Sequence, residues 1–404
     1  MFTIRKISVI FLVTILLMSS CKKDEPIGGV YTTIKVAGLF SKTGDLSYLG
    51  ISSEAAINIA ILQINNDFQE RQIPYRFALT VFDTKIDPVL AVSAMRSLAA
   101  DGYKLVIGPQ TSAELLAIKP IADSLGILVV SPSSTANSLS MPDDMIFRYA
   151  PGEQITGKAM ASTLKKQGKK ALIAISRNDA GSLGLNTAIT SNFVGLGGST
   201  ISAGNFAGTD VDFSLVLAEV KKQILQYAAT YSKAEIAVLS TSFDETTLLF
   251  NQAAQDTVLS SVNWVGGVGF FKNKNLLKDT AASQFAVNTQ FFSPGFTLPA
   301  ANQSIWAPLL SQIFNSTGIQ GDALTLSAYD IMKVFGSMIE TGKGLPNTPA
   351  ALRSAFATAS NAHLGTTGLI MLNANGDRAN GVFDYYGLKK TAGIFDWYFV
   401  GQSE

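Results

Sequence analysis

Histidine and cysteine are almost missing from this chain of 404 residues, since each occurs once, as His363 and Cys21. These two residue types supply most zinc ligands and the reactive groups of Ser-His triads and Cys-His dyads. The sequence therefore argues against metal sites and hydrolytic centres of those kinds. With a single cysteine, a disulfide within the chain is also impossible. We expect no cofactor and no enzymatic activity.

Charge of either sign is in short supply as well. Charged residues make up 15% of the chain, and 31 Lys and Arg face 30 Asp and Glu. A nucleic-acid-binding protein usually shows a basic excess or a basic patch, and neither occurs here, so we expect no nucleic-acid partner. The 47% hydrophobic content supports large cores, and the length allows two domains of common size.

Long apolar runs are missing too, apart from one near the start of the chain. It extends from Ile7 to Met18 behind Arg5 and Lys6, which is shorter than the roughly 20 residues that span a bilayer. Two small residues then precede Cys21. This order is typical of an export signal that ends in a lipobox-like site. We expect residues 1–20 to be a signal peptide and Cys21 to carry the lipid, although an ordinary signal with an incidental cysteine fits the same pattern.

Residues 21–30 are expected to form a tether, because their charges and paired glycines cannot bury a core. Several acyl chains on Cys21 would hold such a protein on a membrane firmly. The stretch Lys22-Lys23-Asp24-Glu25 resembles the charged sorting signal of lipoproteins of the Bacteroidetes type. That resemblance implies a cell-envelope lipoprotein on the periplasmic face or on the outer cell surface.

From Tyr31 onward, apolar strand patterns alternate with helical ones. Strands are expected at Ile34 to Leu39, Phe77 to Phe82, Leu105 to Ile107 and Ile127 to Val130, with helices between them. This order predicts a parallel sheet covered by helices on both faces. The same rhythm restarts after residue 150 and predicts a second lobe of similar build. The stretch from Phe291 to Pro299 is expected to be loop.

Small hydroxyl residues gather in three loops that follow strands of the first lobe. The loops are Ser41-Lys42-Thr43-Gly44, Gly108-Pro109-Gln110-Thr111-Ser112 and Ser131-Pro132-Ser133-Ser134-Thr135. Ligands of open parallel sheets bind outside the carboxyl ends of the strands. Hydroxyls and free backbone N–H groups there can hold a carboxylate without a fixed positive charge. Ser112 and Thr135 are the leading candidates, although Ser and Thr at helix starts are often only caps.

Taken together, these motifs make the chain resemble the leucine/isoleucine/valine-binding proteins, the type I periplasmic solute-binding proteins of ABC transporters. The resemblance covers nearly all of the chain after the signal, and the order and spacing of the motifs carry it. Further matching motifs are Tyr48-Leu49-Gly50, Asp83 with Asp87-Pro88, Phe147-Arg148 with Glu153 and Gly157, Ala328-Tyr329-Asp330, Gly365-Thr366-Thr367-Gly368 and Asn375-Gly376-Asp377-Arg378.

The resemblance implies two similar doubly wound lobes joined by three crossovers, with a cleft that closes by hinge motion. Residues 31–150 and 276–374 would form the first lobe, and residues 151–275 and 375–404 the second. It also implies a small-molecule ligand with a carboxylate or amide, and an ABC transporter permease as partner. The same fold used as a sensor that signals to a membrane protein is the alternative.

Six residues are expected to line the ligand site. By the resemblance, Ser112 grips a ligand carboxylate, and Ser133 and Thr135 belong to the segment that holds carboxylate and ammonium. The other three are expected around the rest of the cleft: Tyr48 on its rim, Glu153 at the lobe crossover as a partner for an ammonium, and Phe243 as a wall of the second lobe.

Two departures from the family pattern leave the ligand open. The chain has Asp179-Ala180-Gly181-Ser182 where the family usually has a Tyr-Gly pair, and Val268 where amino-acid binders place an acidic residue. A buried ammonium without a counter-charge is costly, so a carboxylate without an amino group, a small amide or a peptide fits as well as an amino acid. A hydrolase that uses paired carboxylates is a third reading, with Asp83, Asp179, Asp244 and Glu245 as its candidates.

Overall fold

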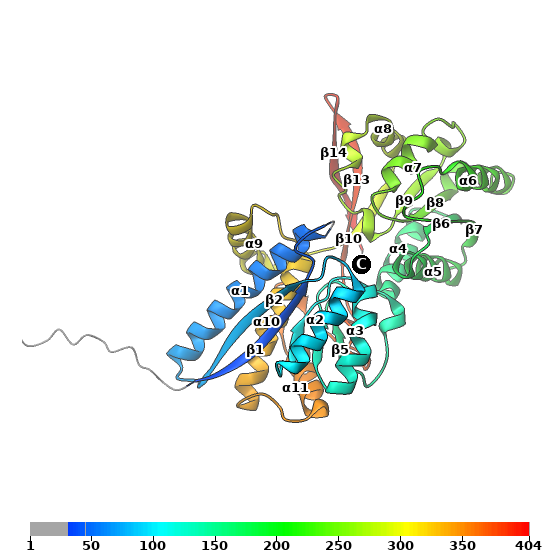
Figure 1. Ribbon diagram of the computed structural model, residues 1–404. Helices are drawn as coiled ribbons and strands as arrows, with labels where there is room; N and C mark the ends of the chain where they lie inside the picture. The colour runs from blue at the N-terminus through cyan, green and yellow to red at the C-terminus, as the bar shows by residue number, and fades with distance from the viewer. Residues whose placement is uncertain (1–30, 45, 404) are drawn as a thin grey trace, which may run out of the picture.

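The computed structural model describes residues 31–44 and 46–403, which form two lobes (Figure 1). The expected signal peptide, the lipid site at Cys21 and the whole expected tether lie outside the described residues. Within them, no helix combines the length and the apolar character needed to cross a membrane.

The first lobe is built on a parallel sheet in the order β2-β1-β3-β4-β5. Strands β1, β3 and β4 are rich in buried aliphatic residues, as expected for a sheet covered on both faces, whereas Phe77 is the one buried residue of the edge strand β2. Its strands are β1 (Thr32–Phe40), β2 (Tyr75–Asp83), β3 (Leu105–Ile107), β4 (Leu128–Ser131) and β5 (Ile146–Arg148). The expected order of strand and helix in this lobe is confirmed.

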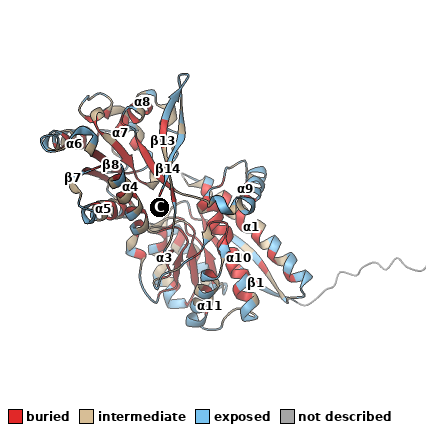
Figure 2. Ribbon diagram, turned by 180° about the vertical axis from the view of Figure 1, so that it is seen from behind, coloured by how far each residue is buried: buried red, intermediate tan, exposed pale blue. Residues whose placement is uncertain are grey.

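Two groups of helices cover this sheet. Helices α2 (Pro88–Ala100) and α3 (Ser112–Leu125) pack together, while α10 (Ala323–Gly342) packs between α1 (Ser47–Glu70) and α11 (Pro349–Asn361). Helix α9 (Gln303–Thr317) packs on α1, and a small hairpin joins β11 (Leu364–Gly365) to β12 (Gly368–Leu369). Figure 2 shows the buried residues concentrated where helices meet the sheet.

The second lobe has a mixed sheet in the order β14-β13-β10-β9-β8-β6-β7. Its strands are β6 (Ala171–Arg177), β7 (Ser199–Phe206), β8 (Ile236–Thr241), β9 (Asn263–Gly266), β10 (Phe292–Phe296), β13 (Phe383–Thr391) and β14 (Ile394–Gln402). The strands from β7 to β10 are parallel, and β13 and β14 add an antiparallel hairpin at one edge. The predicted doubly wound fold is thus confirmed, with this hairpin as an addition.

Each face of the second sheet has its own apolar core. Helices α4 (Glu153–Lys166) and α5 (Ala180–Gly195) pack on one face, and α6 (Ser214–Tyr227), α7 (Thr246–Ala253) and α8 (Thr280–Asn288) on the other. Short 3-10 turns lie in the connecting loops of both lobes: η1 (Asn137–Leu139), η2 (Lys233–Glu235), η3 (Leu259–Ser261), η4 (Val268–Phe270), η5 (Leu276–Lys278) and η6 (Ala300–Asn302).

The predicted lobe boundaries at residues 276 and 375 are wrong, and so is the expected loop from Phe291 to Pro299. Residues 376–378 still pair with the end of β5 in the first lobe. Residues 292–296 form β10, which pairs with β9 and β13 of the second lobe. Leu276 and Phe285 are buried in the core of the same lobe. The chain therefore returns to the first lobe only after Phe296.

Three crossover segments run side by side between the lobes. They are residues 149–152, 297–299 and 379–382, and the Thr297 N–H donates to the Val382 carbonyl at 3.1 Å. The buried guanidinium of Arg378 donates to the carbonyl oxygens of Thr367 and Asn380 and lies over the ring of Phe296. Arg378 Nη1 also donates to the Tyr149 carbonyl at 3.4 Å, so contacts join all three segments into the hinge between the lobes.

Candidate ligand-binding site

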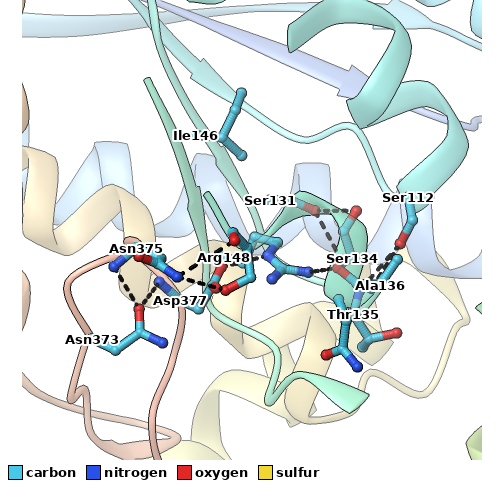
Figure 3. A network of polar contacts seen from close by, with 12 residues as sticks. Ser112, Ser131, Ser134, Thr135, Ala136, Ile146, Arg148, Asn373, Asn375 and Asp377 are labelled. Atoms are coloured by element: carbon cyan, nitrogen blue, oxygen red, sulfur yellow. Dashed lines mark hydrogen bonds and ion pairs between the residues drawn. The ribbon is translucent and has the colours of Figure 1, made fainter. Parts of the chain in front are cut away.

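The most informative loop for function is formed by residues 133–137, here called the cleft loop. It follows β4, so it lies at the carboxyl edge of the first sheet, where ligands of such sheets bind. Ser112, the first residue of α3, lies behind it. The Ser112 hydroxyl oxygen accepts hydrogen bonds from the N–H groups of Thr135 at 3.3 Å and Ala136 at 3.2 Å (Figure 3).

Two charged side chains hold the same loop from the hinge. Arg148 ends β5, and its Nη1 donates to the Ala136 carbonyl at 2.6 Å. Glu153 begins α4 on the other side of the first crossover, and its carboxylate accepts from the Asn137 N–H at 2.9 Å. The Glu153 N–H donates to the Thr135 carbonyl at 3.1 Å. Backbone groups of three consecutive residues are thus satisfied by side-chain and main-chain groups on both sides of the crossover.

Glu153 is buried, with 2% of its surface exposed. Its second carboxylate oxygen, Oε1, has no hydrogen-bond partner among the described residues. Burial raises the pKa of Glu153 to about 7, and the negative charge of Asp179 adds to the rise, while the Asn137 N–H and Arg148 oppose it. A buried carboxylate with an unused oxygen is costly, and a ligand donor at that oxygen would offset the cost.

The cleft loop and α4 border a cavity of about 60 Å³ between the lobes. This volume holds a few water-sized groups, so it suits one end of a small ligand. Three of the predicted site residues, Thr135, Glu153 and Phe243, line it together. The rest of the wall comes from the second lobe and α4: Thr156, Gly181, Ser182, Leu185, Thr241, Ser242, Gly267, Val268 and Gly269.

The hydroxyl groups on the cleft loop and on Ser112 behind it differ in whether their proton is already used in a hydrogen bond. The Ser133 hydroxyl donates to the Gln110 carbonyl at 2.7 Å, so its proton is already used. Ser112 only accepts in its two bonds and retains its O–H. Among the described residues, nothing bonds to the Thr135 hydroxyl. Ser112 and Thr135 therefore keep neutral donors for an anion. The Ser133 N–H donates to the Ser131 hydroxyl at 3.4 Å, so Ser133 can offer a ligand only its hydroxyl oxygen as an acceptor.

The first of the three predicted loops is held by its own lobe. The Ser41 hydroxyl accepts from the Ile86 N–H, and the Thr43 hydroxyl donates to Asp83. Lys42 also donates its N–H to Asp83. None of these three residues lines the cavity, so a role for this loop in ligand binding stays a prediction.

Tyr48, predicted to lie on the rim of the cleft, has 49% of its surface exposed. Partial burial raises the pKa of Tyr48 to about 12, and the charges of Asp322 in the first lobe and Asp244 in the second add to the rise. Its phenol therefore remains a neutral donor at neutral pH. Tyr48 does not line the cavity beside Thr135.

Sequence reasoning missed Arg177, which orders the second-lobe wall. Its guanidinium lies 4.6 Å from the ring centre of Phe243 and pairs with Asp179 at 2.9 Å. Asp179 in turn caps α5 by accepting from the N–H groups of Gly181 and Ser182. Arg177 thus joins two wall segments. Arg177 is the last residue of β6, and a place at the carboxyl end of a strand is the one signal that a sequence could give.

Comparison with known proteins places this architecture in a family. A family model described as periplasmic binding protein matches residues 33–383. This chain belongs to the periplasmic binding protein family. The resemblance inferred from the motifs is confirmed, and relatives of this chain include proteins named as Leu/Ile/Val-binding proteins.

Relatives and solved structures agree with this assignment. An uncharacterised protein of Methanocaldococcus jannaschii is 26% identical over 91% of both chains. The Leu/Ile/Val-binding protein homolog 3 of Brucella melitensis is 22% identical over 92% of this chain and 96% of its own. The leucine binding protein LivK of Thermotoga maritima superposes with a TM-score of 0.69 at 22% identity, covering 92% of this chain and 99% of its own. The last likeness confirms the type I periplasmic binding protein fold.

The two departures from the family pattern both lie in the cavity wall of this periplasmic binding protein. Val268 and Ser182 line it, and Leu185 adds a second aliphatic side chain. Among the lining residues the only ionisable side chain is Glu153. The cavity wall thus lacks an acidic residue at Val268 to pair with a ligand ammonium, but it has the carboxylate of Glu153 on α4.

The four carboxylates considered for a hydrolase are each engaged elsewhere. Asp83 holds the first loop, Asp179 caps α5, Asp244 accepts from Asn273 and Asn275, and Glu245 accepts from the Phe243 N–H. None of them lines the cavity. The family relatives are binding proteins, which agrees with a protein that is not an enzyme.

Burial of Glu153 predicts a pH dependence of stability. Its pKa rises from an ordinary 4.5 to about 7 in the folded protein, so folding favours the protonated form. This contribution is complete below pH 4.5 and is lost as pH rises to about 7, by at most about 3 kcal/mol. Glu153→Gln keeps the shape without the titration. Urea unfolding between pH 4 and 8 should show wild type losing stability relative to this variant, and parallel curves would contradict the assignment.

Proposed function

We propose that this protein is a lipid-anchored, extracytoplasmic solute-binding protein that captures a small carboxylate-bearing ligand between its lobes and delivers it to an ABC transporter. The observation that carries the proposal is a pair of unused hydroxyl donors: Thr135 on the cleft loop, and Ser112 on α3 behind it, whose oxygen helps to fix the backbone of that loop. A fixed loop loses little entropy when the ligand binds. Neutral donors also bind an anion with a weaker electrostatic attraction than a lysine or arginine would, which suits reversible binding.

The geometry supports binding in two steps. The carboxylate first meets the cleft loop of the first lobe, where Thr135 and, from α3 behind the loop, Ser112 can donate to it. Rotation about the crossovers then brings the second-lobe wall of Ser182, Leu185 and Phe243 against the rest of the ligand. Closure of this kind buries the ligand and gives a permease one surface made of both lobes.

The second end of the ligand is proposed to carry a hydrogen-bond donor, as an amino acid or a small amide does. The unused Glu153 Oε1 is the only carboxylate oxygen in the cavity wall, and it replaces the counter-charge that Val268 lacks. Relatives named for binding leucine, isoleucine and valine agree with an amino acid. A carboxylate without a donor is the second candidate, because a protonated Glu153 needs no counter-charge.

Anchoring and location belong to the same proposal. Cys21 follows an export signal and is proposed to carry the lipid, with residues 22–30 as tether. This would place the two lobes on the periplasmic face of a membrane or on the outer cell surface. A sensor that reports the bound ligand to a membrane protein would use the same cleft, and ligand-dependent association with a permease would distinguish transport from sensing.

A binding panel tests the proposal. L-leucine, L-alanine, leucinamide and benzoate are titrated into the protein by calorimetry and thermal shift. Thr135→Val removes only a hydroxyl, and one charge-assisted hydrogen bond is worth roughly 1.5–3 kcal/mol, so affinity for the binding compound should fall about 10- to 100-fold. Thr33→Val, on the exposed amino end of β1, is the matched control and should bind like wild type. Unchanged affinity in Thr135→Val would refute the anion site.

The pH dependence of affinity separates the two candidate ligand classes. Arg148 and Asp179 are the other charges that act on Glu153. An ammonium beside Glu153 favours its ionised form, so the affinity for L-leucine should rise as pH increases through about 7. A ligand with only a carboxylate adds negative charge, so the affinity for benzoate should fall over the same range. Glu153→Gln should flatten either trend, and a trend that persists in this variant would show that Glu153 is not the group that couples pH to ligand affinity.

A further inference from the structure

Arg148 occupies an unusual position in this fold. It is the last residue of β5 and directly precedes the first crossover, and only 2% of it is exposed. Buried arginines are uncommon because the charge must be compensated. Its contacts show what this buried charge holds together.

On one side, Arg148 is bound to the segment that leads into the third crossover. Its Nε donates to Asp377 Oδ1 at 2.6 Å, and the Asp377 side chain is only 7% exposed. The main chain adds two bonds, since the Arg148 N–H donates to the Gly376 carbonyl and its own carbonyl accepts from the Arg378 N–H, both at 3.0 Å. Residues 376–378 therefore lie along β5 as if they were one more strand.

On the other side, Arg148 holds the cleft loop. Nη1 donates to the Ala136 carbonyl at 2.6 Å, and the N–H of the same Ala136 donates to Ser112. Figure 3 shows the guanidinium between Asp377 and the loop that carries Thr135 and Ala136. The Arg148 side chain thus joins residue 377, beside the hinge, to residue 136 of the cleft loop.

We infer that Arg148 is a positioning residue for ligand binding: together with Asp377 it fixes the cleft loop relative to the hinge, so that the Ser112 and Thr135 donors face the ligand. An arginine suits this role because its fork reaches two acceptors in different directions, whereas lysine presents a single nitrogen. The effect of Arg148 on ligand affinity rests on the proposed function, whereas its effect on the conformation of the cleft loop does not.

Hydrogen exchange of the ligand-free protein tests the inference directly. Arg148→Lys retains the positive charge beside Asp377 but cannot also reach the Ala136 carbonyl, and Asp377→Asn retains a hydrogen-bond acceptor without the charge. The amides of residues 133–140 should exchange about tenfold faster in Arg148→Lys, and less so in Asp377→Asn. The melting temperature of each variant reports whether the whole protein remains folded.

Lys169→Met provides a matched control. Lys169 is also a buried cation whose Nζ donates to a backbone carbonyl, that of Ala234, but it lies at the amino end of the second-lobe strands, away from the cleft. Its loss should lower the melting temperature without changing exchange of residues 133–140. Unchanged exchange in Arg148→Lys and in Arg148→Met, with both variants folded, would overturn the inference, as would equal loosening in Lys169→Met.

Titrations of L-leucine and benzoate into the same variants add the functional readout. Affinity should fall at least tenfold in Arg148→Lys for whichever compound binds wild type, and Lys169→Met should bind normally. If wild type bound neither compound, the ligand choice in the proposed function would fail, while the exchange result would still decide the role of Arg148. Wild-type affinity in Arg148→Lys despite a loosened loop would contradict positioning.

Discussion

The structure of the candidate site depends on how the backbone of residues 135–137 is held. Peptide groups that lie away from water must find partners, and an unpaired one costs as much as a lost hydrogen bond. Here Ser112, Arg148 and Glu153 supply those partners from α3, β5 and α4. Because these bonds fix the loop before any ligand arrives, the loop can present donors in place. Replacing one of these three side chains also leaves a backbone peptide group of the loop without its partner. A single substitution should therefore alter the loop beyond the one contact that it removes.

The same bonds tie the site to the hinge. Arg148 and Glu153 lie on either side of the first crossover, and both bind the backbone of the cleft loop. Glu153 already belongs to the first helix of the second lobe. Residues near a rotation axis move least when two lobes open, so this arrangement lets the cleft loop keep its shape while the second-lobe wall of Leu185, Phe243 and Val268 moves. The proposed order of capture, with anchoring on one lobe before closure of the other, follows from this placement.

Much of the fold could be predicted from the sequence, because the strands of the first lobe are short apolar runs with helical patterns between them. Strand β10 was missed because Pro294 and Gly295 make residues 292–296 look like loop. Its main partner, β13, lies some 90 residues later in the chain. The side-chain pattern near residue 292 does not indicate this pairing. Because β10 was not predicted, the lobe boundary was placed before it.

For the site, the sequence indicates residue types at strand ends but not how their protons are shared. It could suggest Ser112, Ser133 and Thr135 together, yet only the structure shows that Ser133 donates its hydroxyl proton to Gln110. Arg148 matched a family motif, but its role depends on Asp377, 229 residues away. Long-range polar pairs of this kind leave no periodic signal in one sequence, whereas buried strands do.

A crystal structure of the protein with the panel compound that it binds would test the central claim most directly. The account predicts a ligand carboxylate within about 3 Å of the hydroxyl oxygens of Ser112 and Thr135. The cleft loop should remain held by Arg148 and Glu153. A ligand whose carboxylate lies against the second lobe or outside the cleft, with both hydroxyls left to water, would contradict it.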